Sequence, residues 1–232
     1  MKPRKSTEKE YARALRKIAK QAALIVDAYA DEHVIANPSR MMEALQRYAE
    51  AIEPFGAKAA AKMIGDTAKS VESEMRKQSK AIAAGLRRYM ASESGIKARE
   101  LMTLQVELIK SLPLEAGLRA QSLAMDAVTG GKRPAEVAAM IGETEQVTTS
   151  RAMLIARTES ARAAAVITEE RAKAVGATHY IWRTAGDSDV RESHAQMEGQ
   201  VCAYDDPPIV DGEPLNPGQI YSCRCYAEPV LS

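Results

Sequence analysis

Apolar residues recur at alternating steps of four and three along much of the first three quarters of the chain. The clearest stripe consists of Tyr11, Leu15, Ile18, Ala22, Ile25 and Tyr29. This period places the side chains on one face of an α-helix, and a narrow apolar stripe needs a partner helix to cover it. Residues 55–90 contain no proline and keep a coiled-coil-like spacing, carried by Ile64, Ala68, Val71, Met75 and Ile82. The pattern therefore predicts a scaffold of long helices.

Capping residues predict where the first helices begin. Thr7 and Glu10 have the spacing of a capping box, in which each side chain satisfies an unpaired N–H of the first helical turn. Pro38 disfavours helix at the residue before it, so Ser39 is expected to cap a second helix that runs to about residue 53. A third, long helix should end before a break at residues 92–95.

Proline and glycine mark the later helices. Pro113 is expected to open a helix that stops at Gly130, because proline suits the first helical turn and glycine suits the residue that ends a helix. A short helix should cover residues 134–141, and a long one about residues 145–174, ahead of Gly176.

The pattern changes after Gly176. Residues 178–184 are rich in β-branched and aromatic side chains and predict a strand, and residues 219–229 could close a small sheet with it. The expected fold is mainly α, a long-helix scaffold with a small C-terminal α+β cap. We divide the chain into a helical N-terminal region (residues 1–97), a second helical part (98–175) and a loop-rich cap (176–232).

The net charge of +1 hides an uneven distribution. Residues 176–232 carry three Lys and Arg against nine Asp and Glu, net −6, which leaves 29 against 22, net +7, for residues 1–175. Eight of the basic residues lie within the first twenty, and such a segment can contact nucleic acid or an acidic protein surface. The alternative is a solvated helix face. No apolar run is long enough to cross a membrane, no secretion signal is recognisable, and three cysteines fit a reducing compartment.

Histidine and cysteine in the cap predict a metal site. His194, Cys202, Cys223 and Cys225 supply four ligands of the kinds that a tetrahedral structural zinc ion takes. The competing interpretation is that Cys223 and Cys225 are buried small residues facing one side of a strand, since strand side chains alternate.

Catalytic signatures are absent from the sequence, so we predict that the chain is not an enzyme. It has no phosphate-binding glycine loop and no serine elbow. A Cys–His nucleophile pair, or an acidic site of a metal-dependent hydrolase, can be drawn only from isolated residues. These are His194 with Cys202 or Cys223, and His194 with Asp187, Asp189, Asp205 and Asp206.

One carboxylate falls on an apolar stripe. Glu159 follows Ile155 on the predicted last long helix, where burial would require a cationic or hydrogen-bonding partner such as Arg157 or Arg191. Alternatively, Glu159 lies at the edge of the stripe and reaches solvent.

Several motifs, in order and at fitting spacing, resemble the Mu F-like family of phage head morphogenesis or minor head (minor capsid) proteins. The resemblance covers roughly residues 98–230. It is carried by Arg157-Thr158-Glu159 with Ala163, by the strand tryptophan Trp182, by Arg191-x-x-His194 with Gly199-Gln200-Val201, and by the closing Ser222-Cys223-Arg224-Cys225. The chain departs from the family pattern at Asp189, where an arginine is frequent, at Cys202, where an aromatic residue is usual, and at Ser222, where asparagine is common.

The resemblance implies a structural role in capsid assembly at the portal vertex, and a part in handling the packaged genome. It implies the portal protein and other head proteins as partners, with double-stranded DNA as a further candidate, in an oligomer or on an oligomeric ring. The protein would belong to the virion and be assembled in the host bacterial cytoplasm. The alternatives are a non-sequence-specific DNA-binding module and, less well supported, a metal-dependent hydrolase.

Overall fold

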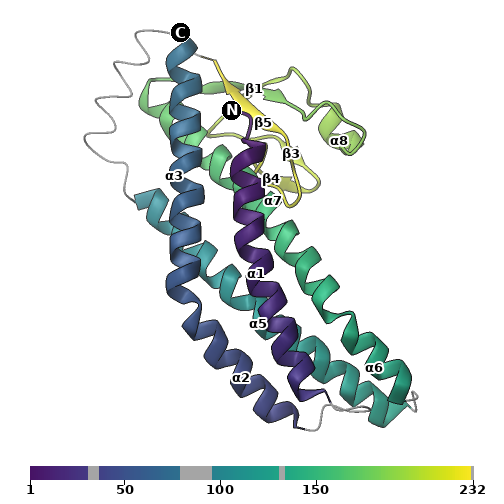
Figure 1. Cartoon of the computed structure of the whole chain (residues 1–232). Helices are drawn as coiled ribbons and strands as arrows, with labels where there is room; N and C mark the ends of the chain where they lie inside the picture. The colour runs from purple at the N-terminus through teal and green to yellow at the C-terminus, as the bar shows by residue number, and fades with distance from the viewer. Residues whose placement is uncertain (31–36, 79–95, 131–133, 231–232) are drawn as a thin grey trace. The chain divides into compact units, whose positions relative to one another are not determined.

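The computed structural model describes residues 1–30, 37–78, 96–130 and 134–230, and most of them are helical (Figure 1). The helices are α1 (Lys5–Tyr29), α2 (Pro38–Ala51), α3 (Glu53–Gln78), α5 (Ile96–Gly130), α6 (Pro134–Gly142), α7 (Thr144–Ala174) and the short α8 (Glu192–Ala195). Every strand among the described residues follows α7. This arrangement confirms the predicted fold class, a mainly α chain with a small C-terminal α+β part.

The strands form two small antiparallel sheets. β1 (His179–Arg183) lies between β2 (Val201–Ala203) and β5 (Tyr226–Pro229) in a three-stranded sheet. β3 (Ile209–Val210) and β4 (Glu213–Pro214) form a hairpin. β1 corresponds to the predicted strand over residues 178–184, and β5 lies in the segment expected to close the sheet against it.

The chain divides into two compact units, each built from separate stretches of sequence. Unit 1 comprises residues 1–10, 61–102 and 157–232, and unit 2 comprises residues 11–60 and 103–156. The three functional regions expected from the sequence remain a prediction. Unit 1 contains all the strands and the C-terminal half of α7, which are coloured green to yellow in Figure 1.

Unit 2 is held together by an apolar core of small and medium side chains. Its members are Ala22, Val26, Met41, Leu45, Ala116, Ala120, Leu123, Ala124, Val137 and Ile141. The stripe predicted on the first helix contributes to this interior, since Tyr11, Leu15 and Ile18 are also buried. The hydroxyl of Tyr11 donates to Oε1 of buried Gln105 at 2.9 Å, so a polar side chain inside this unit is paired.

Two predicted helix starts are wrong. α1 begins at Lys5, which places Thr7 inside the first turn and buried rather than at the cap. The N-cap of α2 is Asn37, not Ser39: Oδ1 of Asn37 accepts from the backbone N–H of Arg40 at 3.1 Å. Asparagine is among the best N-cap residues and Pro38 then occupies the first helical position, so this start satisfies both preferences.

Pro113 does not open a helix. It lies inside α5, which continues from Ile96 to Gly130 as one element. The ring removes one backbone N–H from the helix, but Pro113 is itself buried, and fully buried Ile109 and Leu112 anchor the turn before it. Packing therefore outweighs the local cost. The predicted ending at Gly130 is confirmed, whereas Ile82 and the break expected at residues 92–95 lie outside the described residues.

The remaining helix predictions are confirmed to within a residue or two, at α6 and α7. Gly176 has a φ of +89°, the left-handed conformation expected just after a helix. Among the described residues, no helix is long and apolar enough to span a membrane.

Candidate functional site

The site is built in unit 1, and its first wall is α7. Thr158 and Glu159 are buried there, which confirms that the stripe carries a carboxylate inward. Glu159 Oε1 lies 3.4 Å from a guanidinium nitrogen of Arg162, one helical turn further on. The partners expected from the sequence are engaged elsewhere, because Arg157 pairs with Asp189 and Arg191 with Asp211.

β1 supplies an aromatic wall. Its side chains alternate, so Tyr180 and Trp182 point inward and are fully buried. The backbone N–H of Trp182 donates to the carbonyl of Gln200 at 2.8 Å, and the N–H of Gly199 donates to the carbonyl of Trp182 at 2.9 Å. The indole meets the imidazole of His194 edge to face, with ring centroids 5.8 Å apart.

His194 comes from α8, and both of its ring nitrogens are engaged. Arg191 is the N-cap of this short helix, and His194 in its last turn is buried. Nδ1 faces the two cysteines of the closing motif, and Nε2 lies 3.0 Å from Oδ2 of Asp211.

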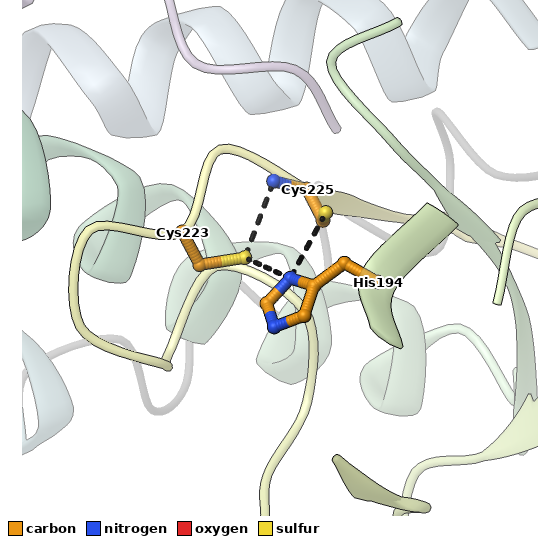
Figure 2. A group of neighbouring side chains, drawn as sticks. All are labelled: His194, Cys223 and Cys225. Carbon is orange, nitrogen blue, oxygen red and sulfur yellow. Dashed lines mark hydrogen bonds between the residues drawn. The ribbon is translucent and has the colours of Figure 1, made fainter. Parts of the chain in front are cut away.

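Cys223 and Cys225 lie in the loop that precedes β5, and their side chains face the same way. Their Sγ atoms lie 3.4 Å and 3.5 Å from Nδ1 of His194 (Figure 2). The backbone N–H of Cys225 donates to Sγ of Cys223 at 3.3 Å. We call these three residues the Cys2His group; their candidate ligand atoms all lie within 4.8 Å of one another.

Cys202 is not part of the Cys2His group, contrary to the four-ligand prediction. It lies on β2 directly opposite Tyr180, whereas the backbone beside Trp182 belongs to Gln200. His194 contacts Trp182, so Cys202 lies two residues along the sheet from the position that faces His194. Burial raises the pKa of its thiol.

Asp211 is the residue that the sequence reasoning missed. The loop between β3 and β4 consists of Asp211 and Gly212, with φ values of 57° and 86°, as in a type I′ turn. The turn delivers the Asp211 carboxylate to α8. It accepts from the Ser193 hydroxyl at 2.6 Å, lies 3.0 Å from His194 Nε2, and pairs with Arg191 at 3.0 Å. These contacts, the Ser193 hydrogen bond first, hold the pKa of Asp211 below its usual value. The Asp-Gly pair between two short extended segments is the sequence signal that marks this turn.

The surroundings favour one thiolate on the cysteine pair. The hydrogen bond from Cys225 lowers the pKa of Cys223 to about 6, and the backbone N–H groups of Gly218 and Cys225 act in the same direction. The pKa of Cys225 is raised, chiefly because its thiol donates to Cys223. The indole N–H of Trp182 opposes that rise.

A pocket of about 270 Å³ opens beside the Cys2His group. It is lined by Arg157, Asp189, Val190, Arg191, His194, Ser222, Cys223, Arg224 and Cys225. Its arginines are paired: Arg224 binds Asp187 through two guanidinium nitrogens and also reaches Asp189. Asp189, a departure from the family pattern, thus contributes the carboxylate that Arg157 and Arg224 share.

Within the described part of the chain, the Cys2His group is the one set of three or more His, Cys, Asp or Glu side chains placed to hold a metal ion. Three of the four acidic residues considered for a hydrolase site are in ion pairs instead: Asp187 and Asp189 with Arg224, and Asp205 with Lys173. One imidazole and two thiols suit zinc, a borderline-soft cation.

Fold and site together define a mainly helical protein whose C-terminal module surrounds a buried histidine with two cysteines. The sequence model of the family described as phage Mu protein F like protein matches residues 120–228, which include all the side chains of this site. This match confirms the predicted resemblance of that part of the chain to the phage Mu protein F-like family.

A curated relative comes from Haemophilus influenzae and is described as an uncharacterized protein. It is 36% identical over 135 residues, which cover 58% of this chain and 30% of the relative. The alignment therefore reaches less than a third of that protein. No solved structure matches the chain.

Proposed function

We propose that the chain acts as a phage minor head protein, with a structural role in capsid assembly at the portal vertex. The observation that carries the proposal is the family match over residues 120–228. The motif residues in that range converge on one pocket, since Arg157, Arg191, His194, Cys223 and Cys225 all line it. The motif residues of the matched region therefore form one site in the folded chain. Virion localisation after assembly in the bacterial cytoplasm follows from this role.

Unit 2 offers a surface for a protein partner. On α5, Leu104, Leu118 and Met125 are exposed, and their spacing is a multiple of seven residues. Positions seven apart lie on the same face of a helix, so these side chains form an apolar stripe toward solvent. Such a stripe suits a helix of the portal protein or of another head protein, because large apolar side chains gain free energy when a partner covers them.

Co-expression with the portal protein of the same phage tests the proposal. We expect a joint complex that survives nuclease treatment and sizing at high salt, because apolar contacts do not weaken with salt. Leu118→Glu with Met125→Glu should abolish the complex, whereas Gln46→Glu, at an exposed position of α2 outside the stripe, should not. Failure of the wild-type chain to form a complex, with either the portal protein or the other head proteins, would refute the assignment.

The second candidate is a non-sequence-specific DNA-binding module. It is favoured by exposed basic side chains on α1, such as Arg13, Lys17 and Lys20. Binding through phosphate contacts should fall steeply between low and physiological salt. DNA binding with that salt dependence, in a chain that forms no complex with head proteins, would favour this candidate over the first.

A further inference from the structure

We propose that the Cys2His group binds one zinc ion with a fourth coordination position that opens into the adjacent pocket, and that Asp211 orients His194 for this purpose. The site differs from the expected closed four-ligand arrangement in two respects. Cys202 is not a ligand, and the Asp211 carboxylate, which is not a ligand either, orients His194. The inference goes beyond the proposed head role and does not depend on it.

The distances fit a tetrahedral ion. Zinc bonds of about 2.3 Å to sulfur and about 2.0–2.1 Å to nitrogen place a thiolate and an imidazole on neighbouring corners about 3.6 Å apart. Cys223 Sγ and Cys225 Sγ lie 3.4 Å and 3.5 Å from Nδ1 of His194. Both sulfur-to-nitrogen distances are therefore within a few tenths of an ångström of the tetrahedral value.

The tautomer of His194 is prepared for coordination. Nε2 lies 3.0 Å from a carboxylate oxygen of Asp211, so the ring proton resides on Nε2 and the lone pair of Nδ1 points at the two sulfurs (Figure 2). A carboxylate behind a ligating histidine fixes the ring and increases its basicity. Asp211 is held in turn by Ser193 and Arg191 and by the type I′ turn.

Hydrogen-bond donors surround the sulfurs. The backbone N–H of Cys225 donates to Cys223 Sγ at 3.3 Å. Trp182 is fully buried and its ring contacts His194, so its indole N–H also lies in the wall of the group. Sulfur atoms bound to zinc would carry negative charge, and hydrogen bonds to a charged acceptor are stronger than those to a neutral one. The donors around the group therefore suit zinc-bound sulfurs.

The fourth position belongs to the pocket. All three side chains of the Cys2His group line it, and Cys202 lies one strand repeat away. Three protein ligands with one open position is the arrangement in which zinc also holds a water molecule or an exchangeable anion. Because Arg191 and Arg224 are already paired with carboxylates, the ion itself would be the main attraction for such an anion.

Metal analysis of the purified full chain is the first test. After equilibration with zinc and removal of excess, we expect one ion per chain. Cys223→Ser and Cys225→Ser should lose it, and Cys202→Ser, which removes a buried cysteine outside the group, should retain it. A wild-type chain without zinc, or loss of zinc from Cys202→Ser, would overturn the site.

Cobalt substitution tests the open position without any variant, so a misfolded mutant cannot obscure it. The wild-type chain loaded with Co²⁺ should show thiolate-to-metal charge transfer and tetrahedral d–d bands. Added thiocyanate should shift the d–d bands, because it can replace the solvent ligand. Unchanged bands would mean four tightly held protein ligands and would overturn the open position.

Asp211→Asn tests the orienting role. We expect zinc affinity to fall about 10–100-fold with the circular dichroism of the fold unchanged, the usual effect of losing such a partner. Glu213→Gln is the matched control, since Glu213 is exposed in the same hairpin and should leave the affinity unchanged. Equal affinities for Asp211→Asn and the wild type would remove Asp211 from the site.

Discussion

Gly218→Ala should destabilise unit 1 more than a glycine substitution of this kind normally does. Gly218 is buried in the loop that passes over α7 on the way to the Cys2His group, and its φ is +87°. A Cβ at this position would lie 3.1 Å from the carbonyl oxygen of Cys225, 3.2 Å from Cβ of Ala165 and 3.3 Å from the carbonyl oxygen of Ala161. Backbone oxygens and a helix-borne Cβ cannot rotate away, so the loop itself must move.

The expected cost has two parts. A left-handed conformation costs a residue with a Cβ about 1–2 kcal/mol. Forcing an extra carbon into a packed site costs about 1–3 kcal/mol more, which gives about 2–5 kcal/mol in total. Gly176→Ala isolates the first part, because Gly176 has a φ of +89° and nothing within 4 Å of the added Cβ.

Urea denaturation followed by tryptophan fluorescence measures both variants. Trp182 is the one tryptophan of the chain and is fully buried in the same unit as Gly218, so its signal reports unfolding of that unit. The free energy of unfolding should fall further for Gly218→Ala than for Gly176→Ala. If the two variants lose the same amount, the close approach of the loop to α7 is wrong.

Three further predictions concern single positions. Ser222 has a φ of 57°, where asparagine is more readily accommodated than serine, so Ser222→Asn should raise the free energy of unfolding in the same denaturation assay, and a fall would contradict this. Gly65 lies inside α3, and a Cβ added there would meet nothing within 4 Å, so Gly65→Ala should raise the thermal midpoint, with a gain of about 0.5–1 kcal/mol from helix propensity; a fall in the midpoint would contradict this. Hydrogen bonds from the Thr184 hydroxyl and backbone N–H hold the pKa of Glu198 below its ordinary value of 4.5. The ionised Glu198 carboxylate therefore stabilises the fold above pH 4.5, and this stabilisation is lost as the pH falls through the lowered pKa of the folded state. Acid titration of stability should therefore be steeper for the wild type than for Glu198→Gln, and equal slopes would count against these contacts.

The helices could be predicted because their signal is local. A stripe of period 3.6 sets which side chains are buried before any partner is known, and Leu15 and Ile18 are buried as expected. The wrong start at Ser39 came from a competing local cap, Asn37, whereas the error at Pro113 arose where tertiary packing overrides a local preference. Pro113 is a helix breaker by propensity, yet it lies within α5 beside buried Leu112.

The Cys2His group could be predicted only in part, for a different reason. His194, Cys223 and Cys225 are recognisable by residue type, but the exclusion of Cys202 depends on strand register. Register sets which side chains share a level of a sheet, and a shift of two residues would bring Cys202 beside Trp182. Neither composition nor spacing fixes that register.

Asp211 shows why a residue that supports the Cys2His group is harder to find than the members of the group. Nothing in its own sequence neighbourhood points to His194, which lies 17 residues earlier. The contact arises because a two-residue turn reverses the chain between β3 and β4 and brings a carboxylate back to α8. The turn can be recognised from Asp-Gly, but its destination is set by the packing of the whole module.

The family motifs are far apart in the sequence but come together in the folded module. Arg157 on α7, Trp182 on β1, Arg191 on α8 and Cys223 in the closing loop are far apart in the chain, and each touches the pocket or the group beside it. These parts of the module meet around buried His194, whose Nδ1 faces the sulfurs of Cys223 and Cys225. An ion at that point would bind α8 to the closing loop directly, in a module whose strands are only two to five residues long. Short strands bury little apolar surface, and a metal link offsets that deficit.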